Sequence, residues 1–148
     1  MRYLKKVLLP LILLATASAS VWAGDGRILS FEGDVKINGQ QVTDETELNR
    51  EDVIVTGPDG AIKFVLADNS IIDMDPDSEL AIIDYSYDPE DMASNTSDMA
   101  LVEGTLRYVS GKISKNDPKD ISFSAAGATI GVRGTYIKIT TCPELGCD

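Results

Sequence analysis

Residues 57–74 read GPDGAIKFVLADNSIIDM, and this stretch decides the fold class. Every second residue from Ile62 to Leu66 is apolar, which is the period of a half-buried strand. Residues 57–60 before it and 68–70 after it are typical of turns, because Pro presets φ and Gly accepts a positive φ. The pattern therefore predicts one strand between two turns.

Similar short strands separated by turns recur along the chain, and Asn38-Gly39 is the clearest hairpin signal. Turn signals about 8–12 residues apart are typical of all-β domains, and no stretch of helical length has a 3.6-residue apolar period. We expect a single all-β domain of short strands, either a β-solenoid-like fold or a twisted β-sandwich. Residues 43–50 are expected to form an irregular link and 88–98 an exposed excursion. The predicted strands cover residues 28–32, 35–37, 41–42, 52–56, 61–66, 72–74, 80–82, 99–106, 107–113, 121–123, 128–132 and 135–139.

The first 23 residues have the layout of a secretory signal peptide. Arg2, Lys5 and Lys6 form a basic region, residues 7–15 are apolar, and Val21-Trp22-Ala23 precedes Gly24. Cleavage is expected after Ala23, with Ala19 as a second possible position. The apolar run is shorter than the ~20 residues that a spanning helix needs, so we do not expect the mature chain to be inserted in a membrane.

Cleavage leaves one domain, residues 24–140, followed by a tail, residues 141–148. It also removes three basic residues and no acidic ones from a chain of net charge −11. Such a surface repels nucleic acid and anionic lipid, and it attracts cations or basic partners. In the tail, Cys142 and Cys147 flank Pro143 and Gly146, and we expect a local disulfide in an oxidising compartment.

Five segments in order resemble the FecR domain, which is named for the periplasmic part of iron-transport regulators. They are residues 28–35, 48–57, 61–70, 101–104 and 131–137. The last contains Gly131-Val132-Arg133-Gly134-Thr135, which matches the closing motif of the family in full and is the most specific signal. The resemblance implies an exported β module that binds a protein partner.

Some positions depart from the family pattern. Glu51 and Asn69 stand where glycine is usual, and Ala125-Ala126 stand where Thr-Pro is common, so we expect local differences in the backbone. The full regulators also carry a cytoplasmic segment that holds a sigma factor. A cleavable signal replaces that segment here, so no sigma factor binding is expected.

The Gly131–Thr135 motif has two interpretations. As a binding site, Gly131, Val132, Gly134 and Thr135 would present Arg133, a planar donor that suits a carboxylate. As a structural element, the glycines meet the geometry of a turn and Arg133 pairs with an internal acid. We favour the structural interpretation.

Alternating carboxylates at Asp73, Asp75, Asp77 and Glu79, with Asp84 beyond, resemble a calcium loop. Pro76 and Ser78 do not fit that geometry, so these residues are weak metal candidates and no cofactor is expected. The chain has no histidine, the commonest general base, and we expect no enzyme activity.

Two functions remain. We favour a periplasmic or secreted, non-enzymatic interaction or signalling module of the cell envelope, with an envelope protein as its partner. The alternative is a calcium-dependent structural component of the envelope or of the extracellular space.

Overall fold

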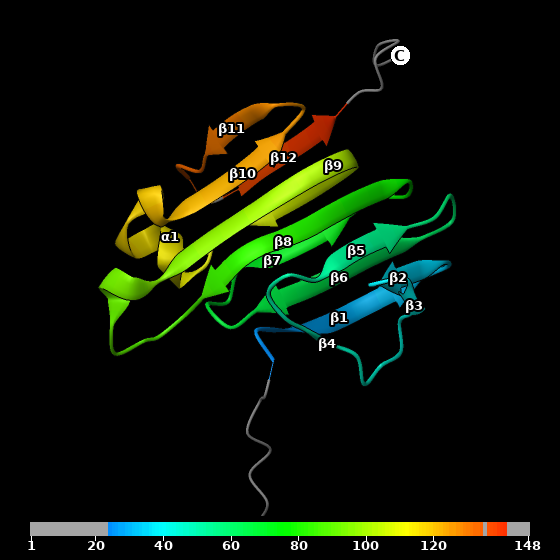
Figure 1. The fold of residues 1–148 in the computed structure, drawn as a ribbon, viewed down its shortest axis with the longest axis horizontal. Coiled ribbons are helices and arrows are strands. Elements are labelled where there is room, and N and C mark those ends of the chain that lie inside the picture. The colour runs from blue at the N-terminus through cyan, green and yellow to red at the C-terminus, as the bar shows by residue number, and fades with distance from the viewer. Residues whose placement is uncertain (1–23, 135, 142–148) are drawn as a thin grey trace, which may run out of the picture.

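The computed structural model describes residues 24–134 and 136–141, and Figure 1 shows their arrangement. These residues form 12 strands, one short α-helix and two 3-10 helices. In chain order the elements are β1 (Gly26–Glu32), β2 (Val35–Ile37), β3 (Gln40–Gln41), β4 (Glu47–Leu48), β5 (Val53–Thr56), β6 (Ala61–Leu66), β7 (Ile71–Met74), β8 (Ser78–Ser86), η1 (Met92–Ser94), β9 (Thr96–Val109), α1 (Lys112–Asn116), η2 (Pro118–Asp120), β10 (Ile121–Ala125), β11 (Ala128–Gly131) and β12 (Tyr136–Thr141).

The all-β prediction is confirmed, and most predicted strands coincide with observed ones to within a few residues. Strands β2 and β6 have the predicted bounds, and Asn38 and Gly39 have the positive φ values, 52° and 79°, of the predicted hairpin turn. Four details were wrong. Strand β4 lies within the expected link, and β9 begins inside the expected excursion. The predicted strands 99–106 and 107–113 are joined in the single strand β9, and the end of the second one belongs to α1.

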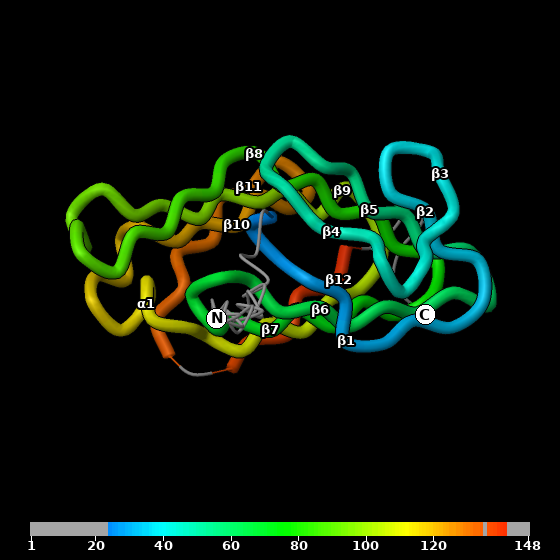
Figure 2. The backbone as a smooth tube through the Cα atoms, turned by 90° about the horizontal axis from the view of Figure 1, so that it is seen from below, coloured from blue at the N-terminus to red at the C-terminus, as the bar shows by residue number. Residues whose placement is uncertain are grey.

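The sheet is folded back on itself into two layers, which Figure 2 shows one above the other. Layer 1 runs β12, the second half of β9, β7, β6, β1 and β4. Layer 2 runs β3, β2, β5, β8, the first half of β9, β10 and β11. Strand β9 belongs to both layers and joins them. Among the described strands only β9 and β10 pair in parallel, so the pairing matches a twisted sandwich closed on one side rather than a solenoid of parallel rungs.

Gly104 is the point at which β9 passes from one layer to the other. Its φ is +90°, and a Cβ there would overlap the Oγ of Ser78 and the carbonyl of Asp77. The bend is also hydrogen-bonded, since the Thr105 amide donates to Ser78 Oγ at 2.9 Å and the Ser78 amide donates to Thr56 Oγ1 at 2.9 Å. Only glycine fits this backbone without displacing its neighbours.

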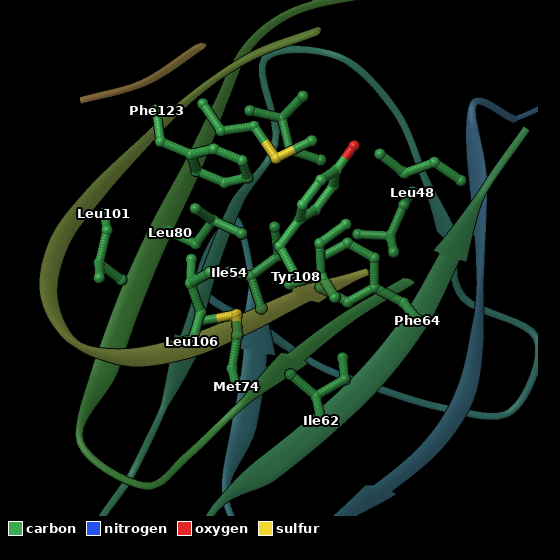
Figure 3. Close-up of a cluster of buried hydrophobic side chains, with 14 of the residues drawn as sticks. Leu48, Ile54, Ile62, Phe64, Met74, Leu80, Leu101, Leu106, Tyr108 and Phe123 are labelled. Carbon is green, nitrogen blue, oxygen red and sulfur yellow. The ribbon is translucent and has the colours of Figure 1, made fainter. Parts of the chain in front are cut away.

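The core lies between the layers, where alternate residues of facing strands meet (Figure 3). Ile62 and Phe64 of β6 point inward from layer 1, and Ile54 and Leu80 point inward from layer 2. The ring of Tyr108 packs edge to face on Phe123, with centroids 5.1 Å apart. Burying these side chains contributes about 1.5–3 kcal/mol each, so the core holds the two layers together.

No helix among the described residues is long and apolar enough to cross a membrane.

Candidate functional site

The predicted motif Gly131–Thr135 connects the edge strand of layer 2 to the edge strand of layer 1. Gly131 ends β11, Val132 is buried in the core, and Gly134 has a φ of +134° just before β12. Val132 therefore anchors the connection, and Gly134 supplies a backbone angle that other residues rarely adopt. Thr135 lies outside the described residues.

Arg133 is exposed, and it makes no ion pair with any residue that the structure describes. The expectation that it pairs with an internal acid is therefore not met among these residues. The neighbouring glycines leave it unobstructed, because a Cβ on Gly131 or Gly134 would meet nothing within 4 Å. The motif thus combines a structural anchor, Val132, with a guanidinium that faces solvent.

The four metal candidates do not converge. Asp73 ends up on β7 in layer 1, Asp75 and Asp77 lie in the following turn, and Glu79 lies on β8 in layer 2. No three acidic or cysteine side chains of the described residues are placed to hold a metal ion. The alternation along the chain is that of a strand, a turn and a strand, which sends successive carboxylates in different directions.

Two of these carboxylates are already paired with cations. Lys63 Nζ lies 3.2 Å from Asp73 Oδ2, and Arg107 binds Asp75 through two hydrogen bonds of 2.6 and 2.9 Å. The hydrogen bonds that Arg107 donates to Asp75, and then the charge of Asp75, raise the pKa of Arg107 above its usual range. Asp73 and Asp75 therefore belong to a surface network of ion pairs rather than to a cation site.

A buried polar cluster around Asp68 was not predicted. Asp68 is 1% exposed, and its Oδ1 accepts from the Ser70 amide at 3.0 Å, the Ser70 hydroxyl at 2.7 Å and the Tyr85 hydroxyl at 3.2 Å. Its carbonyl accepts from the Lys112 amide at 2.8 Å. One residue thus ties the β6–β7 turn to β8 and to the start of α1. The Asp-x-Ser element of the family pattern was the only signal for it in the sequence.

Two tyrosines point into the same interior from opposite layers. Tyr85 comes from layer 2 and Tyr108 from layer 1, and both are almost completely buried. Burial, and then the nearby charge of Asp68, raise the pKa of both hydroxyls above the usual range. The Tyr108 hydroxyl has no hydrogen-bond partner among the described residues. The cluster is enclosed, so its role is to hold the layers in place.

The outer face of layer 2 has a different character. Its middle is a row of small or apolar residues in direct register across four strands, Val53, Ala81, Ala100 and Ser124. Ile83 and Val102 lie at irregularities in the β8–β9 pairing and are 51% and 56% exposed. A shallow depression of about 300 Å³ continues this row past Ser124 towards Ala126 and Gly127.

Two pairs of carboxylates flank this row. Glu79 lies opposite Glu103 on one side, and Asp84 lies opposite Asp98 on the other. None of the four forms an ion pair with a described residue, and only Asp98 accepts a side-chain hydrogen bond, from Ser122 at 2.7 Å. Like charges directly opposite each other destabilise a sheet. We name this surface the acidic-apolar face; neither its exposed residues nor its carboxylate pairs were predicted as a site.

The two residues that stand where the family usually has glycine both have a positive φ. Glu51 has a φ of 69° and Asn69 a φ of 66°, both in the left-handed region. Asn tolerates this region better than Glu does, so Glu51 is the more strained of the two.

Two predicted features lie outside the described residues. These are the signal peptide, residues 1–23, and the cysteine pair Cys142 and Cys147.

Comparison with known proteins identifies the family. The model of the family described as "FecR protein" matches residues 52–143, which is more than half of the chain and includes the Gly131–Thr135 motif. Strands β1 to β4 precede the matched region, yet β1 pairs with β6 and β2 pairs with β5, so they complete the same sheet. Curated proteins and solved structures gave no significant match. FecR proteins are signalling-related modules of the cell envelope, and this chain belongs to the FecR family.

Proposed function

We propose that this protein is an exported, non-enzymatic interaction module that works in the periplasm or outside the cell by binding an envelope protein. Membership of the FecR family supports a signalling role at the envelope. The signal-peptide pattern of residues 1–23 supports export.

The observation that carries the binding role is the acidic-apolar face. It combines exposed Ile83 and Val102 with carboxylate pairs that have no cationic partner among the described residues. Exposed apolar side chains within a polar rim are typical of surfaces that bind proteins. The strong negative charge argues against nucleic acid and anionic lipid as partners.

No observation favours the calcium-dependent alternative. The candidate carboxylates between Asp73 and Glu79 are dispersed, and Asp73 and Asp75 are paired with Lys63 and Arg107. No sigma factor binding is proposed, and no catalytic residues or cofactor are assigned.

Export is tested by expressing the full chain with a C-terminal tag in a bacterial host and determining the N-terminus of the mature protein by mass spectrometry. We expect Gly24, or Ser20 if cleavage follows Ala19, in the periplasmic fraction or the medium. A matched variant, Leu13→Arg, interrupts the apolar region and should leave uncleaved protein in the cytoplasm. An intact N-terminus on the unaltered protein in the cytoplasm would contradict export.

Binding is tested by capturing envelope proteins on the purified mature chain, at low and at high salt. A partner retained at low salt and released by high salt is expected, because salt screens charges on an exposed surface. If no protein is retained specifically under either condition, the proposed function is wrong.

A further inference from the structure

The acidic-apolar face has a defined layout that restricts what can bind to it. The side chains at its centre protrude little from the sheet, because the small residues Ala81, Ala100 and Ser124 lie side by side on β8, β9 and β10. Ile83 and Val102 stand above it on either side of this row, each more than half exposed. Such a surface accepts small apolar side chains between the two raised ones.

The carboxylate pairs set the distance between the positive charges that a partner needs. Glu79 and Asp84 are five residues apart on β8, and Asp98 and Glu103 are five apart on β9. Each strand has one bulged residue in this interval, Ile83 on β8 and Val102 on β9, so four paired steps separate the two pairs. At a rise of about 3.3 Å per step, the pairs lie about 13 Å apart along the strands. A partner therefore needs positive charge at two places separated by that distance.

The charges also exclude a second copy of this chain on this face. Two such faces brought together would place carboxylates against carboxylates in a protein of net charge −11, and like charges across an interface oppose association. A cationic partner, in contrast, would relieve the repulsion that exists between Glu79 and Glu103 and between Asp84 and Asp98 before it binds.

The outer face of layer 1 does not offer the same site. It also carries apolar residues, Val65, Ile71 and Val109, in register, each partly covered. The two carboxylates at the end of β7 on this face, however, are neutralised, because Asp73 pairs with Lys63 and Asp75 with Arg107. A cationic partner would have to displace those lysine and arginine side chains.

We propose that the acidic-apolar face binds a protein segment in which small apolar residues lie between two groups of lysine or arginine about 13 Å apart. The inference rests on the proposed function and specifies the chemistry of the partner. Apolar contact at Ile83 and Val102 gives the affinity, and the two carboxylate pairs select a basic segment and fix its position.

The first experiment uses the purified mature chain and synthetic peptides of three kinds. In the first, small apolar residues lie between two lysine pairs; the second replaces the lysines with glutamates, and the third scrambles the first. We expect only the first to bind, with affinity that falls as salt rises. In NMR spectra, its amide shift changes should map to β8, β9 and β10.

Variants locate the binding. Glu103→Lys and Asp98→Lys should each lower the affinity for the lysine peptide by about tenfold or more, since each replaces an attraction between opposite charges with a repulsion between like charges. Val102→Ser and Ile83→Ser should weaken it without changing its dependence on salt. Lys63→Glu on the outer face of layer 1 is the matched control and should leave binding unchanged. Thermal unfolding must show that every variant is folded.

Equal affinity for the lysine and glutamate peptides, equal binding by the Glu103→Lys variant, or shift changes confined to layer 1 would each overturn the inference. A second experiment separates it from the proposed function. A photo-cross-linking residue is placed at position 102 or at position 63 of the full chain in cells. A partner that cross-links to position 102 supports both this inference and the proposed function. A specific partner that cross-links only to position 63 overturns this inference and leaves the proposed function standing. If no partner cross-links to either position, both the inference and the proposed function are contradicted.

Discussion

The two outer faces of the folded sheet share strand β9 but distribute their charges in opposite ways. On layer 1, each carboxylate of the central strands has a cation nearby, as Asp73 has Lys63 and Asp75 has Arg107. On layer 2, Glu79 lies opposite Glu103 and Asp84 opposite Asp98, with no ion pair among the described residues. The first arrangement is neutralised within the domain, and the second leaves four carboxylates without a cation among the described residues.

This difference shows why counting acidic residues does not locate a site. The carboxylates with the most regular spacing in sequence, Asp73 to Glu79, are separated by the fold. The carboxylates that the fold brings together, Glu79 with Glu103 and Asp84 with Asp98, lie on two consecutive strands, and only the register between these strands places them opposite each other.

The largest expected effect comes from removing the bend that separates the two faces. Gly104→Ala forces a Cβ against Ser78 and Asp77 at a φ of +90°, and should lower the free energy of unfolding by about 2–5 kcal/mol. Urea unfolding measures it. Gly131→Ala is the control, because a Cβ there meets nothing within 4 Å and its φ is not positive. Equal effects of the two substitutions would contradict the role given to the bend.

The next effect concerns the interior that both faces share. Asp68→Ala leaves the Ser70 hydroxyl and amide and the Tyr85 hydroxyl without their common acceptor, and should cost about 3 kcal/mol or more. Asp73→Ala, on the exposed face of layer 1, should cost much less. The comparison is made by urea unfolding at neutral pH, and similar losses for the two variants would show that Asp68 does not hold the layers together.

The same interior predicts a dependence on alkaline pH. Burial raises the pKa of Tyr85 and Tyr108, so the folded chain keeps two protons that the unfolded chain releases above about pH 10. Their contribution to stability is complete below that pH and is lost as pH rises, by up to about 1.4 kcal/mol per pH unit for each tyrosine. Urea midpoints should fall between about pH 10 and pH 11.5, and less steeply for Tyr85→Phe. A slope unchanged by that substitution would remove Tyr85 from the explanation.

The smallest expected effect is the change in the free energy of unfolding when a charge is reversed on either outer face. Its sign should differ between the two faces. Glu103→Lys places a lysine opposite Glu79 and should raise the free energy of unfolding by about 0.5 kcal/mol. Lys63→Glu places a glutamate opposite Asp73 and should lower it by a similar amount. Both changes should shrink in high salt. A loss of stability with Glu103→Lys would mean that the carboxylate pairs of layer 2 are not repulsive.

Much of the fold could be predicted from the sequence, because the alternation of apolar residues reports directly which side of a strand is buried. Strand β6 is the clearest case, with Ile62, Phe64 and Leu66 all in the core. The passage of β9 between layers could not be predicted, since the sequence predicts only that a strand, residues 99–106, runs through Gly104. Its meaning depends on Ser78 and Asp77, which are distant in the chain.

The candidate site was predicted less well than the fold. The Gly131–Thr135 motif was recognised, and the burial of Val132 agrees with its structural interpretation. The acidic-apolar face was not recognised, because it depends on which residues of β8 and β9 lie opposite each other. Irregularities in that pairing expose Ile83 and Val102, and apolar alternation alone does not reveal such irregularities.

The central claim is that this FecR domain is a self-sufficient β module that acts by binding a protein and not by binding a metal. The most direct test is thermal unfolding of residues 24–148 with millimolar calcium and with chelator, followed by circular dichroism. We predict a β spectrum and the same midpoint in both, because the described carboxylates form no metal site. A midpoint that rises with calcium would contradict the claim, since only a ligand bound to the folded state raises it by mass action.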